Sequence, residues 1–131
     1  MFLKEKRNAH WEQHQMTNRN PPSPGRAVRG SSTGRPLMAA MDLLGRRWAL
    51  RILWELRDGA LGARALQARC GGMSSSVLYE RLRELIDTGL VAQDADGSYG
   101  LTKMGGRLRS ALQPLDQWAT TWAAAQARKE G

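Results

Sequence analysis

The sequence predicts a mainly helical domain that carries one small β-hairpin, and three observations support this fold class. Apolar residues recur at three- and four-residue steps through most of the chain after residue 36, which is the spacing of one helical face. The pair Asp96-Gly97 lies between two short apolar runs and is a strong signal for a hairpin turn. The length of 131 residues allows one domain with a modest core.

Residues 1–36 are expected to be a disordered basic arm. They contain "NPPSPG" and "RGSSTGRP" and show no sustained apolar period. They hold seven Lys/Arg against two Asp/Glu, so most of the formal charge of +8 lies here. Such an arm could add phosphate contacts, or it could have no fixed partner. The folded domain is predicted over residues 37–127, and its mild charge fits either a nucleic-acid partner or an ordinary basic protein.

Two helices are expected at the start of the domain. Their apolar residues share one helical face and are Met41, Leu44, Trp48, Ile52 and Leu56. Gly45 interrupts this run and is expected to divide it into two helices. The tripeptide "RDG" at 57–59 is a stop signal, because Gly59 can take the left-handed conformation that ends a helix.

A short helix over 63–70, a tight turn at Gly71-Gly72 and a second helix over 74–88 are expected next. Ser74 is a good N-cap for the second helix, because its hydroxyl can accept from an unpaired amide of the first turn. The inward side of that helix is expected to consist of Leu78, Leu82, Leu85 and Ile86. Gly89 is a good C-terminal stop.

The rest of the chain predicts a hairpin and a long final helix. The segments "LVAQ" and "SYGL" are expected to form two short strands around "DADG". The last helix should start near Thr102, with a kink or a break at Pro114, which lacks a backbone donor. Its apolar stripe consists of Leu108, Leu112, Leu115, Trp118 and Trp122.

A short helix, a glycine turn and a second helix make a helix-turn-helix, and the hairpin after it makes a winged one. With the leucines inward, short hydroxyls at the start of helix 74–88 can approach phosphates or base edges, where the helix's positive end also attracts phosphate. Arginine can reach guanine edges or phosphates. The candidate DNA-binding residues are Ser74, Ser75, Ser76, Tyr79, Glu80, Arg81 and Arg83, with Arg64 from the preceding helix. Helix capping and an ordinary solvated face would explain the same residue types.

Residues 37–126 resemble the HxlR-type winged-helix transcriptional regulators, which are related to the MarR group. The motifs that carry the resemblance are "LLGRRWALRILWEL", "MSSSVLYERLRELIDTGLV", "YGLTKMGGRL" and "LDQW". The resemblance implies a bacterial DNA-binding homodimer that senses a small molecule or an oxidant. It also implies that the first and last helices pair across the dimer and that helix 74–88 reads DNA. The chain departs from the family at Gly62-Ala63, where an Arg-aromatic pair is usual, and in its short wing with two aspartates.

A set of large side chains could line an effector pocket between helices or form the dimer seam. Its members are Met41, Trp48, Trp54, Trp118 and Trp122. Cys70 is interpreted as a buried, inert thiol rather than a redox centre. No cofactor or metal is expected. The chain also lacks a secretory signal and an apolar run long enough to span a bilayer, so a cytoplasmic protein without a membrane partner is expected.

Catalysis is not expected, because both histidines, His10 and His14, lie in the arm and no phosphate-binding glycine loop or metal-ligand set is present in the sequence. The predicted function is sequence-specific binding of double-stranded DNA by a homodimer, with helix 74–88 in the major groove. Its operator should be pseudo-palindromic, with recognition helices about 34 Å apart. A winged helix that serves as a protein-interaction adaptor is the alternative.

Overall fold

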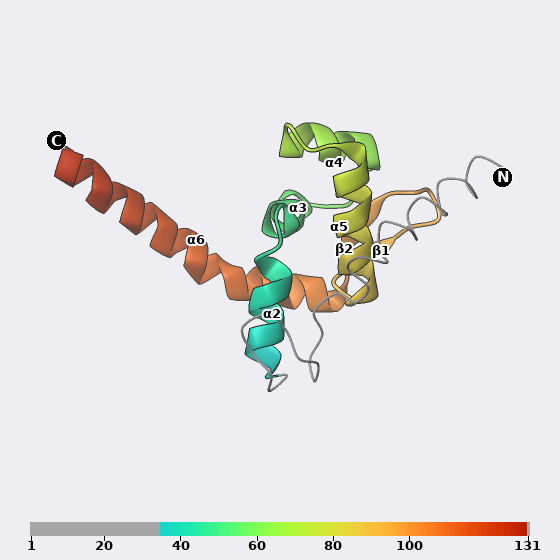
Figure 1. Ribbon diagram of the computed structural model, residues 1–131, viewed down its shortest axis with the longest axis horizontal. Coiled ribbons are helices and arrows are strands. Elements are labelled where there is room, and N and C mark those ends of the chain that lie inside the picture. The colour runs from blue at the N-terminus through green and yellow to red at the C-terminus, as the bar shows by residue number, and fades with distance from the viewer. Residues whose placement is uncertain (1–34, 131) are drawn as a thin grey trace.

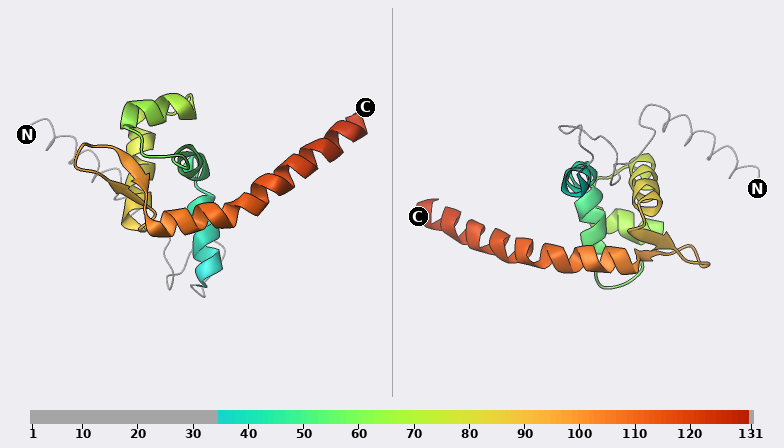
Figure 2. Two further views of the ribbon diagram at one scale, coloured as in Figure 1. Left: turned by 180° about the vertical axis from the view of Figure 1, so that it is seen from behind. Right: turned by 90° about the horizontal axis from the view of Figure 1, so that it is seen from below.

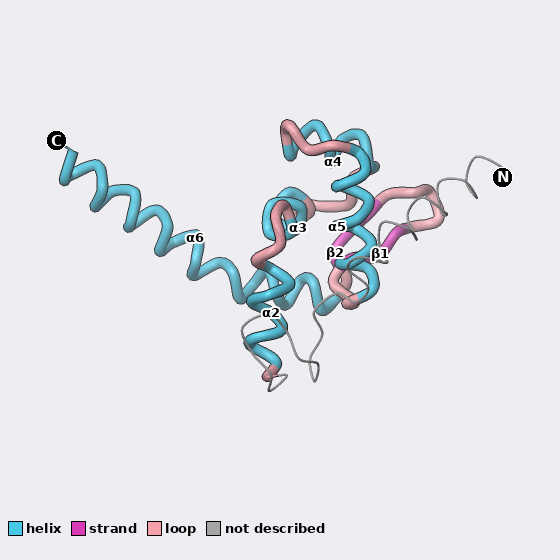
Figure 3. Tube along the Cα trace, in the orientation of Figure 1, coloured by secondary structure: helices cyan, strands magenta, loops and turns pink. Residues whose placement is uncertain are grey.

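The computed structural model describes residues 35–130. Its helices and strands are shown in Figure 1 and, coloured by type, in Figure 3. The predicted arm lies outside the described residues except for Arg35 and Pro36. The elements, in chain order, are α2 (Pro36–Leu44), α3 (Ala49–Glu55), α4 (Ala63–Cys70), α5 (Ser75–Asp87), β1 (Val91–Gln93), β2 (Tyr99–Leu101) and α6 (Lys103–Glu130). The mainly helical fold class with one hairpin is confirmed.

The first apolar run is divided at Gly45, as predicted. Helix α2 ends one residue earlier, and α3 begins after a turn whose last residue is Trp48. Trp48 has a left-handed backbone with φ of 78°, which costs a non-glycine residue of order 1–3 kcal/mol. The prediction for Gly59 is wrong. Helix α3 ends at Glu55 with Leu56 as its C-cap, and Gly59 has φ of 148° four residues beyond the helix.

The helix-turn-helix has the predicted boundaries. Gly71 and Gly72 both have positive φ, at 58° and 81°, and they turn the chain from α4 into α5. The Ser74 hydroxyl accepts a hydrogen bond of 3.2 Å from the Val77 amide, so the predicted N-cap is confirmed. Gly89 follows α5 with φ of 81°.

Strands β1 and β2 pair antiparallel, with Val91 opposite Leu101. Gly97 has φ of 92° in the connecting turn, and the Asp96 carboxylate accepts from the Ser98 amide at 3.0 Å. A contact that the sequence did not predict extends this hairpin. Leu61 and Tyr99 exchange backbone hydrogen bonds of 2.9 and 2.8 Å, which tie the loop before α4 to the wing.

Helix α6 is continuous through Pro114, so the alternative of a break is wrong. The helix changes direction along its length, as expected for a helix with an internal proline, and its C-terminal half extends away from the other elements (Figures 1 and 2). At its start, Thr102 donates a side-chain hydrogen bond of 2.6 Å to the Gly89 carbonyl and accepts one from the Gly105 amide at 3.1 Å. These bonds fix the beginning of α6 against the end of α5.

The core lies where α3, α4, α5 and the hairpin meet. Its buried members are Ile52, Leu53, Leu56, Leu66, Cys70, Met73, Leu78, Leu82, Leu85, Val91 and Tyr99. Three of the four residues predicted for the inward side of α5 are almost fully buried, while Ile86 is half-buried. Within residues 35–130, no helix combines the length and the apolar content that a bilayer crossing requires.

Truncation of Leu82 tests this core. Its side chain is 1% exposed on the inner face of α5, so Leu82→Ala removes buried contacts and leaves a cavity. We expect a loss of roughly 2–5 kcal/mol in the free energy of unfolding, measured by urea denaturation followed by circular dichroism. A wild-type denaturation midpoint would place Leu82 outside the core.

Candidate nucleic-acid interface

The N-terminal turn of α5 and one side of the helix are exposed. Ser75 and Ser76 follow the Ser74 cap and are exposed, and the Ser74 and Ser76 hydroxyls lie 3.4 Å apart. Arg83 lies two turns further along the same side, with 57% of its side chain exposed and its Nε 3.6 Å from an Asp87 oxygen. This side therefore presents hydroxyls, the N-terminal end of a helix and one guanidinium to solvent.

Tyr79 and Glu80 are less exposed than the sequence suggested. Tyr79 is half-buried and packs against the core, where burial and the nearby Tyr79 raise the pKa of Tyr99. Truncation of Tyr79 to alanine would therefore remove core contacts as well as its hydroxyl, whereas Tyr79→Phe isolates the hydroxyl. The Glu80 side chain is only 14% exposed and lies 3.5 Å from the Arg81 guanidinium.

Arg81 differs most from its expected placement. Its Nε donates to the Arg47 carbonyl at 2.8 Å, and its Nη1 donates to Glu84 at 3.0 Å. The side chain is 16% exposed. Arg81 is therefore turned toward the α2–α3 connection rather than outward beside Arg83, and its guanidinium is occupied by contacts within the protein.

Glu84 is the only buried charged residue of the described chain. It also accepts a hydrogen bond of 2.6 Å from Arg46 Nη1. Burial raises the pKa of Glu84, while the charges of Arg46 and Arg81 act in the opposite direction. We call the set of Arg46, the Arg47 carbonyl, Arg81 and Glu84 the α5 clamp, because it joins the α2–α3 turn to α5.

Two side chains that the sequence did not single out hold the corner between α4 and α5. Gln67 donates to the Met73 carbonyl at 3.1 Å and lies 3.4 Å from the Ser75 hydroxyl. Arg51 of α3 donates to the Arg69 carbonyl at 2.8 Å near the end of α4. The sequence did not predict these two contacts. Both hydrogen bonds go to backbone carbonyls that come within reach only when the chain turns between the helices.

The comparisons with known proteins agree with this geometry. Residues 43–127 match the family described as HxlR-like helix-turn-helix. The chain belongs to this family. It is 34% identical over 89 residues to the uncharacterized HTH-type transcriptional regulator YvaP of Bacillus subtilis (strain 168), covering 63% of this chain and 82% of YvaP.

Solved structures give the same result for the fold. The quinone-bound YodB from B. subtilis matches with a TM-score of 0.61 and 30% identity, covering 65% of this chain and 94% of YodB. A possible HxlR family transcriptional factor from Thermoplasma volcanium matches with a TM-score of 0.58 and 29% identity, covering 65% and 82% of the two chains. The chain is therefore a winged helix-turn-helix transcriptional regulator of the HxlR/MarR type and not an enzyme.

The wing of this HxlR-like chain has an acidic tip. Asp94, Ala95 and Asp96 are exposed, and Asp96 also closes the hairpin turn. Carboxylates at the tip are repelled by DNA phosphates. Arg64 is exposed on α4, next to Gly62 and Ala63, where an Arg-aromatic pair was expected from the family resemblance.

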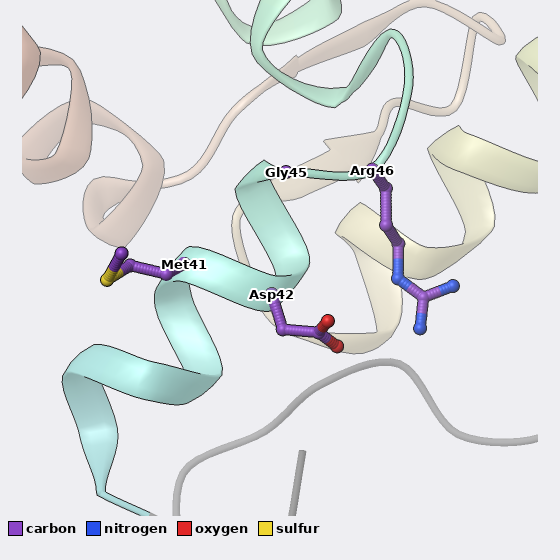
Figure 4. A pocket seen from close by; sticks show the side chains of 4 residues that line it. All are labelled: Met41, Asp42, Gly45 and Arg46. Atoms are coloured by element: carbon purple, nitrogen blue, oxygen red, sulfur yellow. The ribbon is translucent and has the colours of Figure 1, made fainter. Parts of the chain in front are cut away.

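Of the residues proposed for an effector pocket or dimer seam, only Met41 lines the open hollow beside α2. Met41 lines an open hollow of about 170 Å³ with Asp42, Gly45 and Arg46, and its side chain points away from those of Asp42 and Arg46 (Figure 4). Trp48 is half-buried against the core. The exposed fractions of the other candidates are 59% for Met41, 41% for Trp54, 58% for Trp118 and 53% for Trp122. Such exposure favours a seam over a pocket within one chain.

Cys70 is buried at the end of α4, with 3% of the residue exposed. Burial raises the pKa of its thiol, the charge of Arg51 lowers it and that of Glu55 raises it. A thiol kept protonated is a poor nucleophile and a poor redox centre. Residues 35–130 contain no group of three or more His, Cys, Asp or Glu residues that could hold a metal ion.

Proposed function

We propose that this HxlR-family chain binds DNA sequence-specifically as a homodimer on a pseudo-palindromic operator, with α5 in the major groove. The observation that carries the proposal is the exposed side of α5. The Ser74 cap leaves Ser75, Ser76 and Arg83 accessible on one side, while leucines hold the opposite side in the core.

This exposed side has the chemistry that a duplex requires. The first turn of α5 offers amides and hydroxyls, and the positive end of the helix favours a phosphate there. The guanidinium of Arg83 can donate two hydrogen bonds to the O6 and N7 atoms of guanine. Arg64 on α4 is placed for a phosphate contact, which would fix position but carry no sequence information. The acidic wing tip suggests that the wing contributes little to phosphate binding.

A homodimer is supported by where the large apolar side chains are exposed. Eight large apolar residues are exposed in the part of the chain that the structure describes, and six of them belong to α2 or α6. These six are Leu37, Met41, Met104, Leu115, Trp118 and Trp122. Exposed apolar surface of this kind marks interfaces. Pairing of these helices between two copies would cover it and would set the two α5 helices about 34 Å apart, one turn of the duplex.

A small-molecule effector is part of the same proposal, with its site at this seam. Trp118 and Trp122 stack on each other with ring centroids 5.5 Å apart, and such rings also stack on planar ligands. One structural relative, YodB, was solved with a quinone bound, which supports a planar, quinone-like ligand for this chain.

Recovery of bound fragments from genomic DNA, followed by mobility shifts on the recovered sites, tests the proposal. A sequence-specific reader enriches one pseudo-palindromic site, prefers it over bulk competitor and loses affinity steeply as salt rises. A protein-interaction adaptor would give weak binding that does not depend on sequence, which would refute the proposal and favour that second function.

Arg83→Ala is the sharpest single substitution on the proposed interface. Because the Arg83 side chain is exposed, its removal should leave the fold intact. We expect a loss of about 1–3 kcal/mol in operator binding, measured by fluorescence anisotropy with a labelled site. Arg128→Ala on the far end of α6 removes the same charge and should bind as the wild type does. Equal affinity for the Arg83 and Arg128 variants would show that this side of α5 does not read DNA.

A further inference from the structure

The contacts that hold α5 are of two kinds. The leucines on its inner side pack against the core, and such packing is not directional. The α5 clamp adds hydrogen bonds, which require donor–acceptor distances of about 2.7–3.2 Å and near-linear geometry. Packing sets which side of the helix faces the core but tolerates small rotations and shifts, whereas the clamp restricts the remaining rotation and the position of the helix along its own axis.

We propose that Arg46, Arg81 and Glu84 are positioning residues that set the orientation of the recognition helix and thereby its DNA specificity, without touching DNA. This inference rests on the proposed function of α5. The arrangement of the helix supports it, because Arg81 and Glu84 flank Arg83 in sequence but face the α2–α3 turn while Arg83 faces solvent. A rotation of α5 that is large enough to break the hydrogen bonds of the clamp would move Arg83 and Ser76, on the same helix, by a similar distance.

The other end of the clamp is a turn that is held by packing against the core. Arg46 and Arg47 immediately precede Trp48, whose left-handed backbone persists only where the surroundings hold it. Trp48 packs against the core, and the Arg47 guanidinium lies 5.5 Å from its ring centroid. The turn also connects directly to α2, so the clamp joins α5 to a helix of the proposed dimer seam.

A role in stability alone would not require charges at this place. Apolar side chains of similar volume often stabilise a fold as well as a buried ion cluster does, because ions lose their hydration on burial. The side chains of the clamp are 7–16% exposed, so these charged groups have lost most of their hydration. What the charged groups add is hydrogen bonds of defined geometry. These bonds hold the orientation of a helix that must match base edges.

The test replaces the three side chains together, as Arg46→Met, Arg81→Met and Glu84→Met in the full-length chain. We expect the triple variant to melt within a few degrees of the wild type and to bind its operator at least tenfold more weakly. Its affinity for unrelated duplex should fall no more than that of a double control, Arg128→Met with Arg109→Met, which removes two exposed arginines outside the clamp. Operator affinity equal to that of the control would overturn the proposal.

The salt dependence separates positioning from phosphate contact. If Arg46 or Arg81 touched phosphate, the slope of log affinity against log salt would become shallower by about one per contact, and the proposal would be wrong. We expect an unchanged slope. Should the triple variant fail to fold, the single variant Arg81→Met leaves Glu84 paired with Arg46. It is also expected to lower the ratio of operator affinity to affinity for unrelated duplex.

A measurement without DNA distinguishes failure of this inference from failure of the proposed function. In amide NMR spectra of the free protein, clamp removal should shift resonances along α5 as far as Ser75 and Ser76. Shifts confined to residues 46–48 and 80–85 would overturn the positioning role even if the wild type binds its operator. Absence of an operator for the wild type would instead refute the proposed function.

Discussion

Replacing Gly105 with alanine is expected to destabilise the domain by roughly 3 kcal/mol, the upper end of the range for overpacked sites. Gly105 is buried at the start of α6, where the helix passes the end of α5. A Cβ at this position would clash with the Leu90 carbonyl oxygen and would lie 3.3 Å from the Leu101 Cβ. The obstacle is backbone, so no side-chain rotation can relieve it.

The measurement is a thermal melt followed by circular dichroism. For a domain of this size, each kcal/mol lowers Tm by about 4–8 °C, so a large shift is expected. Gly106→Ala is the matched control, because a Cβ there meets nothing within 4 Å. An alanine inside a helix is favoured over glycine by about 0.5–1 kcal/mol, so the control should melt at or above the wild-type temperature. Equal melting of the two variants would show that α6 does not pass this closely over Leu90.

Replacing Trp118 with glutamate is expected to give a monomer that no longer binds a two-half-site operator tightly. Trp118 is 58% exposed and stacks on Trp122 in the C-terminal half of α6. That half of the helix extends away from the other elements (Figure 2). A charge at the centre of a seam cannot be buried without a partner. Since a monomer holds only one half-site, operator affinity should fall by at least a hundredfold, which is about 2.7 kcal/mol.

Sedimentation gives the oligomeric state, and anisotropy with one and two half-sites gives the binding. Ala124→Glu is the control, since it adds the same charge to an exposed position on the opposite side of α6. It should remain dimeric. A dimeric Trp118→Glu variant with normal operator binding would place the seam elsewhere.

Local signals in the sequence were sufficient for most of the helix-turn-helix. The Ser74 cap, the glycine pair before it and the leucines of α5 each depend on residues within one or two turns, so their pattern predicts the helix and its buried side. The end of α3 was predicted wrongly because Leu56, a core residue, closes that helix through tertiary packing rather than through a left-handed glycine.

The sequence by itself determined the class of this protein, the order of its elements and the side of α5 that faces solvent. Only the tertiary structure decided which charges on that helix are exposed and which are held by contacts with the rest of the protein. Arg81 and Arg83 look alike in sequence, yet one is held by Glu84 and the Arg47 carbonyl and the other is exposed. The physical reason is that a charged group's role depends on partners brought from a turn 34 residues away, and periodicity within one helix carries no information about them.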